Sequence, residues 1–435
     1  MEFPKVLTAN WGVPDSHTLA VARQRGVYSR LQKTFAMAPG EVTQVVKDSG
    51  LRGRGGAGFP TGMKWSFVPG KDKRGDKPVY LLCNADESEP GTFKDRYCLW
   101  LDPHLLIEGM LIACWALDCH RAYIYLRGEF KFVQKRLDEA LAEARAAGLV
   151  GKNVLGTGFD CEIYTHLGAG AYICGEETAL ISSIEGEKGQ PKLKPPFPAV
   201  EGAWRMPTIV NNVETLQAVP WILEHGAAAY KAIGTEKSPG TKLFSVSGHV
   251  NKPGVYEVPL GVPMKQFIEE TCGGVRGGKK LKAVIPGGSS VPVMTPEEVE
   301  KANLDYESIN QVAGSYLGSG GMIVMDETTD MVAALTNLLR FYAHESCGQC
   351  TPCREGCGWM HAILERVRDG VATEEDLATL KDLADNIHSK TICFFGASAA
   401  MPVQSFLQKF RADFLERVKR PISPVPVVPV AAGAV

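Results

Sequence analysis

Five cysteines in the last quarter of the chain constrain it more than any other feature. Cys347, Cys350 and Cys353 stand at every third position of one run, and Cys357 and Cys393 follow. Zinc knuckles normally use two separated pairs of ligands, whereas an unbroken C-x2-C-x2-C run lets one loop supply three thiolates to a cubane. The alternatives are a zinc site or a set of buried thiols. The spacing favours an iron–sulfur cluster, with a fourth ligand from farther along the chain.

The composition is that of an ordinary soluble protein with two or three domains. Of the 435 residues, 45% are hydrophobic and 22% are charged, and the formal net charge is −2. This charge gives no field that would attract nucleic acid, and no apolar run is long enough to insert into a bilayer. The N-terminus resembles neither a signal nor a transit peptide. With twelve cysteines, we expect a protein of the reducing bacterial cytoplasm, which reaches the inner membrane only through partner subunits.

A glycine-rich segment at residues 51–65 carries the second strong signal. It contains Gly53-x-Gly55-x-x-Gly58, which matches the dinucleotide-binding fingerprint. That fingerprint normally follows a strand, but residues 41–50 have helical spacing, so the usual βαβ unit is only weakly indicated. The backbone can still approach a phosphate, and the segment also carries basic residues, namely Arg52, Arg54 and Lys64. We predict a phosphate-binding loop, and the alternative is a flexible surface loop.

Two further loops follow apolar segments. Residues 77–84 are a buried strand run that opens into an acidic loop at 85–91. Parallel sheets bind ligands at this end of a strand, where carboxylates suit sugar hydroxyls, but a solvated acidic turn explains the loop equally well. Residues 168–179 form another glycine-rich loop that leads into a helix. Glu176 and Glu177 either cap that helix or stand beside a ligand.

Alternating strands and helices predict a parallel α/β sheet in the first half of the chain. Strands are expected at residues 122–126 and 161–166, and helices at 102–119 and 130–147. Residues 208–215 place two adjacent amides at a strand-to-helix turn.

The pattern changes twice in the second half. Short β-type runs with one helix predict a small α+β module; they lie at residues 243–246, 255–258, 264–272 and 283–286. Helical periodicity then predicts a bundle with helices at 331–344, 360–368, 374–387 and 398–419, and Thr373 with Asp376 resembles a capping box. The chain is thus divided into an α/β domain with an N-terminal arm (1–240), an α+β domain (241–328), a helical bundle (329–420) and a disordered tail (421–435).

Four of these motifs, in this order, resemble one family: the flavin- and NADH-binding subunit of respiratory complex I, the NADH:quinone oxidoreductase. They are the loop 52–65, the segment 84–91, the turn 168–179 and the cysteine run, and the similarity covers essentially residues 20–415. The resemblance implies an atypical Rossmann-like domain for FMN and NADH, a ubiquitin-like α+β domain, and a bundle that holds a [4Fe–4S] cluster.

The resemblance also implies the site residues. FMN is expected against Gly53, Arg54, Gly55, Gly56, Lys64, Asn84, Asp86, Glu87, Tyr172, Gly175, Glu176, Asn211, Asn212 and Thr215. NADH is expected against Phe59, Lys64, Phe67, Glu89, Glu177, Lys194 and Phe197, with Glu89 and Glu177 nearest the reaction. On this interpretation glycines and Arg54 take the phosphate, acids and amides take hydroxyls, and aromatic rings stack on adenine.

The fourth cluster ligand needs a decision between Cys357 and Cys393. Taken alone, the spacing up to Cys357 copies that of bacterial ferredoxins, in which the fourth cysteine of the run ligates the other cluster of a pair. The family's fourth ligand matches Cys393, and a ligand from another helix closes the cage better. We therefore expect Cys347, Cys350, Cys353 and Cys393 as ligands, and Cys357 as a buried thiol beside them.

The resemblance implies that hydride passes from NADH to FMN and that single electrons pass through the cluster to partner subunits, towards quinone. The expected partners are a small thioredoxin-like [2Fe–2S] subunit and a large multi-cluster subunit. No protein nucleophile is required, because the cofactor carries the chemistry. Two alternatives stay open: the diaphorase subunit of an NAD-dependent hydrogenase or formate dehydrogenase, and a non-catalytic nucleotide-binding scaffold with a structural zinc.

Overall fold

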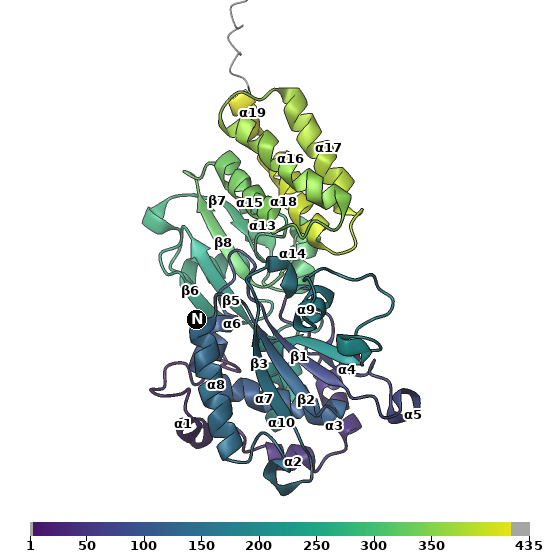
Figure 1. Cartoon of the computed structure of the whole chain (residues 1–435). Coiled ribbons are helices and arrows are strands. Elements are labelled where there is room, and N and C mark those ends of the chain that lie inside the picture. The colour runs from purple at the N-terminus through teal and green to yellow at the C-terminus, as the bar shows by residue number, and fades with distance from the viewer. Residues whose placement is uncertain (1–2, 419–435) are drawn as a thin grey trace, which may run out of the picture.

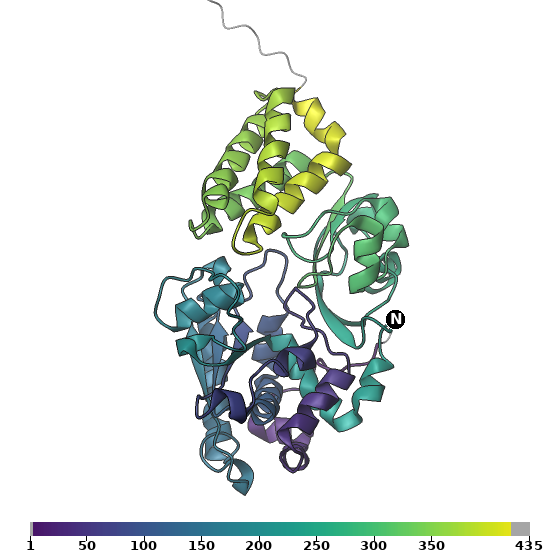
Figure 2. The same cartoon turned by 90° about the vertical axis from the view of Figure 1, so that its right-hand side faces the viewer.

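The computed structural model describes residues 3–418, which form three packed bodies (Figure 1). An α/β domain lies at one end, a helical bundle at the other, and a smaller domain with a second sheet lies between and beside them (Figure 2). The predicted disordered tail at 421–435 lies outside the described residues. Within residues 3–418 no single helix combines the length and the apolar character needed to cross a membrane.

The first domain is built on a four-stranded parallel sheet in the order β3-β2-β1-β4. Its strands are β1 (Tyr80–Ala85), β2 (Arg121–Leu126), β3 (Glu162–Leu167) and β4 (Thr208–Asn212). The larger helices are α3 (Pro39–Asp48), α6 (Asp95–Leu101), α7 (Pro103–Leu117), α8 (Lys131–Ala146), α9 (Glu177–Ile184) and α10 (Val213–His225), and the shorter ones are α1 (Leu19–Gln24), α2 (Leu31–Phe35), α4 (Thr61–Trp65), α5 (Lys71–Arg74) and α11 (Ala227–Lys231). The predicted β/α alternation is confirmed.

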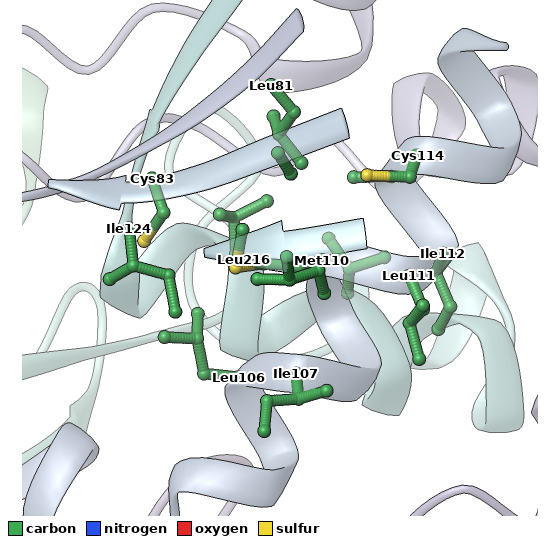
Figure 3. Close-up of a cluster of buried hydrophobic side chains, with 14 of the residues drawn as sticks. Leu81, Cys83, Leu106, Ile107, Met110, Leu111, Ile112, Cys114, Ile124 and Leu216 are labelled. Carbon is green, nitrogen blue, oxygen red and sulfur yellow. The ribbon is translucent and has the colours of Figure 1, made fainter. Parts of the chain in front are cut away.

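Helix α7 forms the centre of this domain, and nearly all of its residues are buried. A helix that is apolar on every side belongs inside a protein. Figure 3 shows how its side chains meet those of β1, β2 and α10; the labelled residues are Leu81, Cys83, Leu106, Ile107, Met110, Leu111, Ile112, Cys114, Ile124 and Leu216. This core fixes the strands, and so fixes where their carboxyl ends present polar residues.

The second domain has a mixed sheet in the order β6-β5-β8-β7. Its strands are β5 (Thr241–Gly248), β6 (Gly254–Pro259), β7 (Leu281–Ile285) and β8 (Gly321–Asp326), and its helices are α12 (Met264–Gln266), which continues as a π-helical turn over Phe267–Thr271, α13 (Pro296–Lys301) and α14 (Tyr306–Ala313). Sequence analysis missed β8, α13 and α14. Strand β8 lies between two neighbours and is almost wholly buried, so it lacks the alternation that marks a half-exposed strand.

The bundle contains α15 (Met331–Glu345), α16 (Thr351–Arg368), α17 (Glu374–His388), α18 (Phe395–Lys409) and α19 (Arg411–Val418). The predicted capping box of α17 is present. Two predictions were wrong. The single helix expected at 398–419 is divided near Phe410, and α16 begins at Thr351 rather than 360, so Cys353 and Cys357 lie inside a helix.

Glycines concealed the early start of α16, because they lower helix propensity. Gly356 has a packing role instead: a Cβ there would stand 2.4 Å from Cδ1 of Ile387 in α17. The proline after Thr351 occupies the first turn of the helix, where proline is favoured.

Candidate functional site

A cleft of about 230 Å³ opens at the carboxyl ends of β1 and β4, where the three domains meet. Ten of the predicted site residues line it: Gly55, Asn84, Asp86, Glu87, Glu89, Tyr172, Gly175, Glu176, Asn212 and Cys393. The cleft also has lining residues that sequence analysis missed: Ser88, Thr92, Lys94, Asp95, Ile173, Ser319, Phe394, Phe395 and Ser398. A cysteine of the predicted cluster therefore shares one cavity with the acidic and amide groups.

Asp86 shows that the cleft can accept a polar ligand. Its Oδ2 atom is buried and has no hydrogen-bond partner in the described part of the chain. Burial raises the pKa of Asp86 to about 7, because a charged carboxylate loses its hydration there. A carboxyl group with a pKa of about 7 is roughly half protonated at neutral pH, so it can donate to, or accept from, a ligand hydroxyl or amide.

The glycines at the entrance leave room for such a ligand. A Cβ on Gly175 would stand 3.6 Å from Oδ2 of Asp86, and a Cβ on Gly55 would stand 3.1 Å from Cβ of Asn212. Asn84 donates from Nδ2 to the carbonyl of Gly175 (2.8 Å). The donors, acceptors and bare backbone of this cleft fit the ribityl chain and ring edge of a flavin.

Glu87 lines the cleft, but its carboxylate is already engaged. Its Oε1 accepts from the backbone N–H of Asp95 at 2.7 Å, and its Oε2 accepts from Nε of Arg96 at 2.9 Å. Helix α6 begins at Asp95, so Glu87 neutralises the positive end of that helix. Because both carboxylate oxygens are engaged, Glu87 can contact a ligand mainly through its backbone and its side-chain CH₂ groups.

Arg54 does not enter the cleft. Its guanidinium is buried beneath the glycine-rich loop and donates to the carbonyls of Thr241 (3.1 Å) and Pro239 (2.8 Å) and to the hydroxyl of Tyr230 (3.1 Å). Only its Nη1 atom has no partner among the described residues, and the expected phosphate contact of this guanidinium stays a prediction. Arg54 supports the loop from below, and its own N–H donates to Oγ1 of Thr215 (2.8 Å).

Other predicted residues also hold the loop rather than line the cavity. Trp65 donates from Nε1 to Oδ1 of Asn211 at 2.8 Å, which ties α4 to β4. Tyr306 of the second domain donates its hydroxyl to the carbonyl of Gly53 at 2.9 Å. Gly56 has φ +149, and a Cβ there would meet nothing within 4 Å. The loop is therefore fixed at both ends while its tip stays open.

Glu177 lies beside the cleft between two lysines. Lys64 Nζ is 2.8 Å from its Oε2, and Lys194 Nζ is 2.5 Å from its Oε1. Although burial opposes it, these ammonium groups lower the pKa of Glu177, so Glu177 is an anion at neutral pH. Lys64 also donates to the carbonyl of Val210 (2.9 Å). Lys194 Nζ also lies 3.4 Å from Oε1 of Glu176, so two ammonium groups and two carboxylates meet around this triad at the entrance.

Three predicted aromatic residues are exposed near this triad. Phe59 and Phe67 are 44% and 51% exposed, and their ring centroids are 6.0 Å apart. Phe197, three residues after Lys194, is 58% exposed. Exposed aromatic faces of this kind offer stacking surfaces to a flat ring, although none of the three lines the cavity itself.

Glu89 is held from two sides of the cleft. Tyr172 donates its hydroxyl to Oε2 at 2.6 Å, and the N–H of Ser290 donates to Oε1 at 2.8 Å. Ser289 Oγ lies 3.3 Å from the same Oε1. Burial raises the pKa of Glu89, and these donors oppose the rise.

The cysteines gather where the bundle faces the cleft. The Sγ atoms of Cys353 and Cys357 are 3.9 Å apart in the first turns of α16, and the N–H of Ile392 donates to Sγ of Cys350 at 3.4 Å. Cys347, Cys350 and Cys393 are partly exposed, whereas Cys357 is fully buried. Burial raises the pKa of Cys393 to about 12, and the thiols of Cys347 and Cys353 contribute.

The donor set fits an iron–sulfur cluster by its chemistry. Among residues 3–418, no three Cys, His, Asp or Glu side chains already converge at metal-binding distances. The thiols nevertheless come from the loop before α16, from the first turn of α16 and from the link before α18, and a backbone N–H reaches a sulfur. Thiolates together with backbone N–H donors are what iron–sulfur clusters use.

Three family models match the three domains in order. The family model "Nuo51 FMN-binding domain" matches residues 46–221, "SLBB domain" matches 242–317, and "NADH-ubiquinone oxidoreductase-F iron-sulfur binding region" matches 333–417. An F subunit of the NADH-quinone oxidoreductase of Rhizobium meliloti is 49% identical over 96% of this chain and 98% of its own length. The corresponding protein of Streptomyces coelicolor is 52% identical, over 95% of this chain and 91% of its own.

The chain belongs to the family of NADH-quinone oxidoreductase F subunits. Its fold class is thereby confirmed, with an FMN-binding α/β domain, an SLBB domain and an iron–sulfur helical region. Among solved structures, an air-oxidised NAD⁺-reducing [NiFe]-hydrogenase superposes with a TM-score of 0.82 at 38% identity, covering 96% of this chain and 67% of that chain. The NADH-quinone oxidoreductase relatives are the more similar in sequence.

The unpredicted lining residues come from all three domains: five from the α/β domain, one from the second domain and three from the bundle. Ser319 of the SLBB domain hydrogen-bonds to Thr92 at 2.5 Å, and it stands in a Gly-Ser-Gly-Gly run that resembles the other two loops. That composition was the available signal. Lys94 carried no signal, because its burial against Asp95 (2.8 Å) and Glu214 (2.7 Å) depends on the fold.

Proposed function

We propose that this chain is the NADH-oxidising subunit of an NADH:quinone oxidoreductase, with FMN in the cleft and a [4Fe–4S] cluster on the cysteines. One observation carries the proposal: Cys393 lines the same cleft as the acidic, amide and glycine residues. When bound, FMN supplies the conversion of a hydride pair into single electrons, which the cluster conducts onward. A cofactor in the cleft therefore lies next to a ligand of the cluster, so that an electron passes between them without crossing another domain.

The chain's own residues orient the flavin. Asn84, Asp86, Glu176 and Asn212 present polar groups to the cleft, and Gly55 and Gly175 let backbone approach it. Glu176 is fixed because its Oε2 accepts from the N–H groups of Thr178 (2.8 Å) and Ala179 (3.0 Å). Five further cofactor-binding residues act through the backbone or support the loop: Gly53, Arg54, Gly56, Asn211 and Thr215. The other three act through neighbouring side chains or helices, because Lys64 pairs with Glu177, Glu87 holds the start of α6 and Tyr172 donates to Glu89.

The entrance supplies the NADH contacts. Lys64 and Lys194 attract the dinucleotide phosphates, and Phe59, Phe67 and Phe197 offer faces to the adenine. Glu89 and Glu177 stand nearest the nicotinamide end, where they orient the ring. No residue needs to act as a nucleophile, because this chain's task is to bind, orient and exclude water.

The cluster ligands are Cys347, Cys350, Cys353 and Cys393. Cys357 is fully buried on the inner face of α16, one turn after Cys353, so it packs behind the site as a protonated thiol. The thiol of Cys353 and burial both raise its pKa well above the ordinary range. A thiol of that kind stabilises its neighbour's sulfur by a weak hydrogen bond.

The chain acts within a multi-subunit complex. The specific partners that we propose are a small thioredoxin-like [2Fe–2S] subunit and a large multi-cluster subunit, and the location is the cytoplasmic side of the inner membrane. The second candidate is a diaphorase subunit of a soluble hydrogenase, which the 0.82 TM-score supports. The approximately 50% identity to the NADH-quinone oxidoreductase proteins favours the first.

An anaerobic optical and EPR titration of the purified chain with NADH tests the proposal, together with flavin and iron analysis. We expect bleaching of the flavin followed by a reduced-cluster signal. Cys393→Ser should abolish the cluster signal and leave flavin bleaching, whereas the matched Cys357→Ser should keep both. Bound flavin that NADH does not bleach would refute the electron donor, and loss of the cluster only in Cys357→Ser would refute the ligand assignment.

A further inference from the structure

A hydrogen-bonded chain of four side chains crosses all three domains behind the cleft. Tyr172 of the α/β domain lies 2.6 Å from Oε2 of Glu89, and Ser289 of the SLBB domain lies 3.3 Å from Oε1. Ser289 Oγ is in turn 2.7 Å from the hydroxyl of Tyr342, which belongs to α15 of the bundle. Ser289 and Tyr342 are fully buried.

When Glu89 is ionised, the donors and acceptors of this hydrogen-bonded network can be assigned in only one way. A serine hydroxyl has a single proton, so when Ser289 donates to Glu89, Tyr342 must donate to Ser289. If Glu89 were protonated on Oε1, the order would reverse and the proton of Tyr342 would need another acceptor. Among the described residues the Tyr342 hydroxyl has no hydrogen-bond partner except Ser289. The chain therefore favours the ionised, fixed carboxylate.

The SLBB turn that carries Ser289 is shaped to fit Glu89. Gly288 has φ +97, and a Cβ there would stand 2.5 Å from Cγ of Glu89, so a larger residue would displace the glutamate. The N–H of Gly288 donates to the carbonyl of Gly321 (2.7 Å), and that of Ser289 donates to the carbonyl of Pro90 (3.1 Å). The turn is thus tied both to its own sheet and to the loop that bears Glu89.

The bundle contributes to the same arrangement from the other side. Tyr172 stacks edge-on against Phe341 (centroids 5.2 Å apart) and Phe395 (5.7 Å), and its N–H donates to Oε2 of Glu345 at 3.0 Å. Both oxygens of Glu89 are therefore oriented by groups whose positions depend on how the bundle is seated.

We propose that Ser289 and Tyr342 are positioning residues for Glu89, so that the SLBB domain and the bundle set the orientation of the carboxylate that meets the nicotinamide end of NADH. This inference rests on the proposed function. It makes nucleotide affinity depend on the docking of the cluster-bearing bundle, although neither Ser289 nor Tyr342 lines the cleft.

The test compares Ser289→Ala, Tyr342→Phe and the double variant, each as flavin- and cluster-loaded protein. Calorimetric titration with NAD⁺, which does not react with the oxidised protein, should show roughly threefold to tenfold weaker binding in each single variant. The double variant should be no weaker than Ser289→Ala, because Tyr342 acts through Ser289. Steady-state rates with an artificial acceptor should show a raised KM for NADH and little change in kcat. Tyr316→Phe is the control, since that tyrosine is 44% exposed.

Gly288→Ala is a second test of the inference, because it leaves every hydroxyl in place. The added methyl group should displace Glu89 and so weaken NAD⁺ binding. Additive losses in the double variant, or a fall in kcat without a change in KM, would overturn the inference. If the wild type binds NAD⁺ and Glu89→Gln binds it equally well, the inference falls while the proposed function stands. If the wild type itself does not bind NAD⁺, both fall.

Discussion

At the scale of single residues, Asp86 shows how burial sets chemistry in the cleft. Its pKa rises from 3.8 to about 7 on folding, so between these values the folded chain binds more protons than the unfolded chain. Stability therefore falls as the pH rises through this window. We predict that Asp86→Asn stabilises the flavin-free protein at pH 8 by roughly 2–4 kcal/mol, with little difference below pH 4.

Thermal unfolding of the flavin-free protein at several pH values measures this effect. The matched control is Asp72→Asn, which changes an exposed aspartate and should leave the pH dependence as it is. Equal Tm differences between wild type and Asp86→Asn at all pH values would show that folding does not raise the pKa of Asp86.

Glu177 gives a prediction about the two forms of the nucleotide. NADH carries one more negative charge than NAD⁺, so an anion at the entrance repels NADH more strongly. Glu177→Gln removes the carboxylate that Lys64 and Lys194 share and leaves Lys194 paired with Glu176 alone. We expect it to tighten NADH by roughly 1 kcal/mol more than NAD⁺. Inhibition constants for NAD⁺ and KM values for NADH at low and high salt measure the difference. Equal tightening of both forms would contradict the charge argument.

The residue scale also shows what sequence can predict about the site. Asn84, Asp86 and Glu89 were predictable because they lie at and just after the end of a buried strand, and the cysteines because their spacing is specific. The direction of Arg54 was not predictable: a basic residue in a glycine-rich loop looks like a phosphate ligand, but the buried carbonyls beneath the loop bind it. Ser319 and Lys94 reach the cleft only through packing between segments far apart in sequence.

At the scale of helices, the contact between α7 and α10 controls the position of the site. A Cβ on Gly109 of α7 would stand 2.1 Å from the carbonyl oxygen of Leu216 in α10, so the two backbones touch. Helix α10 begins directly after Asn212, which lines the cleft. The sequence predicted a helix at 102–119 and a strand-to-helix turn at 208–215, but a glycine inside an apolar helix gave no sign of its neighbour.

We therefore predict that Gly109→Ala moves α10 and costs roughly 2 kcal/mol or more, as overpacking does. Flavin affinity should fall because Asn212 moves with the helix. Flavin fluorescence titration of the refolded protein measures this, and Gly358→Ala is the matched control, since a Cβ there would meet nothing within 4 Å. Unchanged flavin affinity in Gly109→Ala would show that α10 does not transmit the shift.

At the scale of the whole molecule, the three domains are joined by buried polar groups rather than by linkers alone. Lys242 of the SLBB domain donates to the carbonyl of Arg54 at 3.1 Å, and Gln190 of the α/β domain donates to the carbonyl of Cys347 at 3.1 Å. The cleft is thus completed only when all three are assembled. Sequence patterns assigned the order of the domains but not these junctions, because each pairs residues that look ordinary in their own segment.

Glu257 is the clearest junction that can be tested without touching the cleft. Its buried carboxylate accepts from the N–H groups of Val6 (2.8 Å), Leu7 (3.0 Å) and Thr8 (2.9 Å) and from Oγ1 of Thr241 (2.7 Å). These bonds fasten the N-terminal segment to the SLBB sheet. A neutral amide has only one acceptor oxygen, so Glu257→Gln leaves buried N–H groups unsatisfied, each at a cost of about 1–3 kcal/mol.

We predict that Glu257→Gln lowers the Tm and speeds hydrogen exchange at residues 6–8, while flavin content and its reduction by NADH stay at the wild-type level. Exchange mass spectrometry on peptides from both ends of the contact measures this. Glu297→Gln, at an exposed helix start in the same domain, is the control. If flavin content falls when residues 6–8 exchange faster, this junction, and not only the residues that line the cleft, is needed for the cofactor domain to keep its structure.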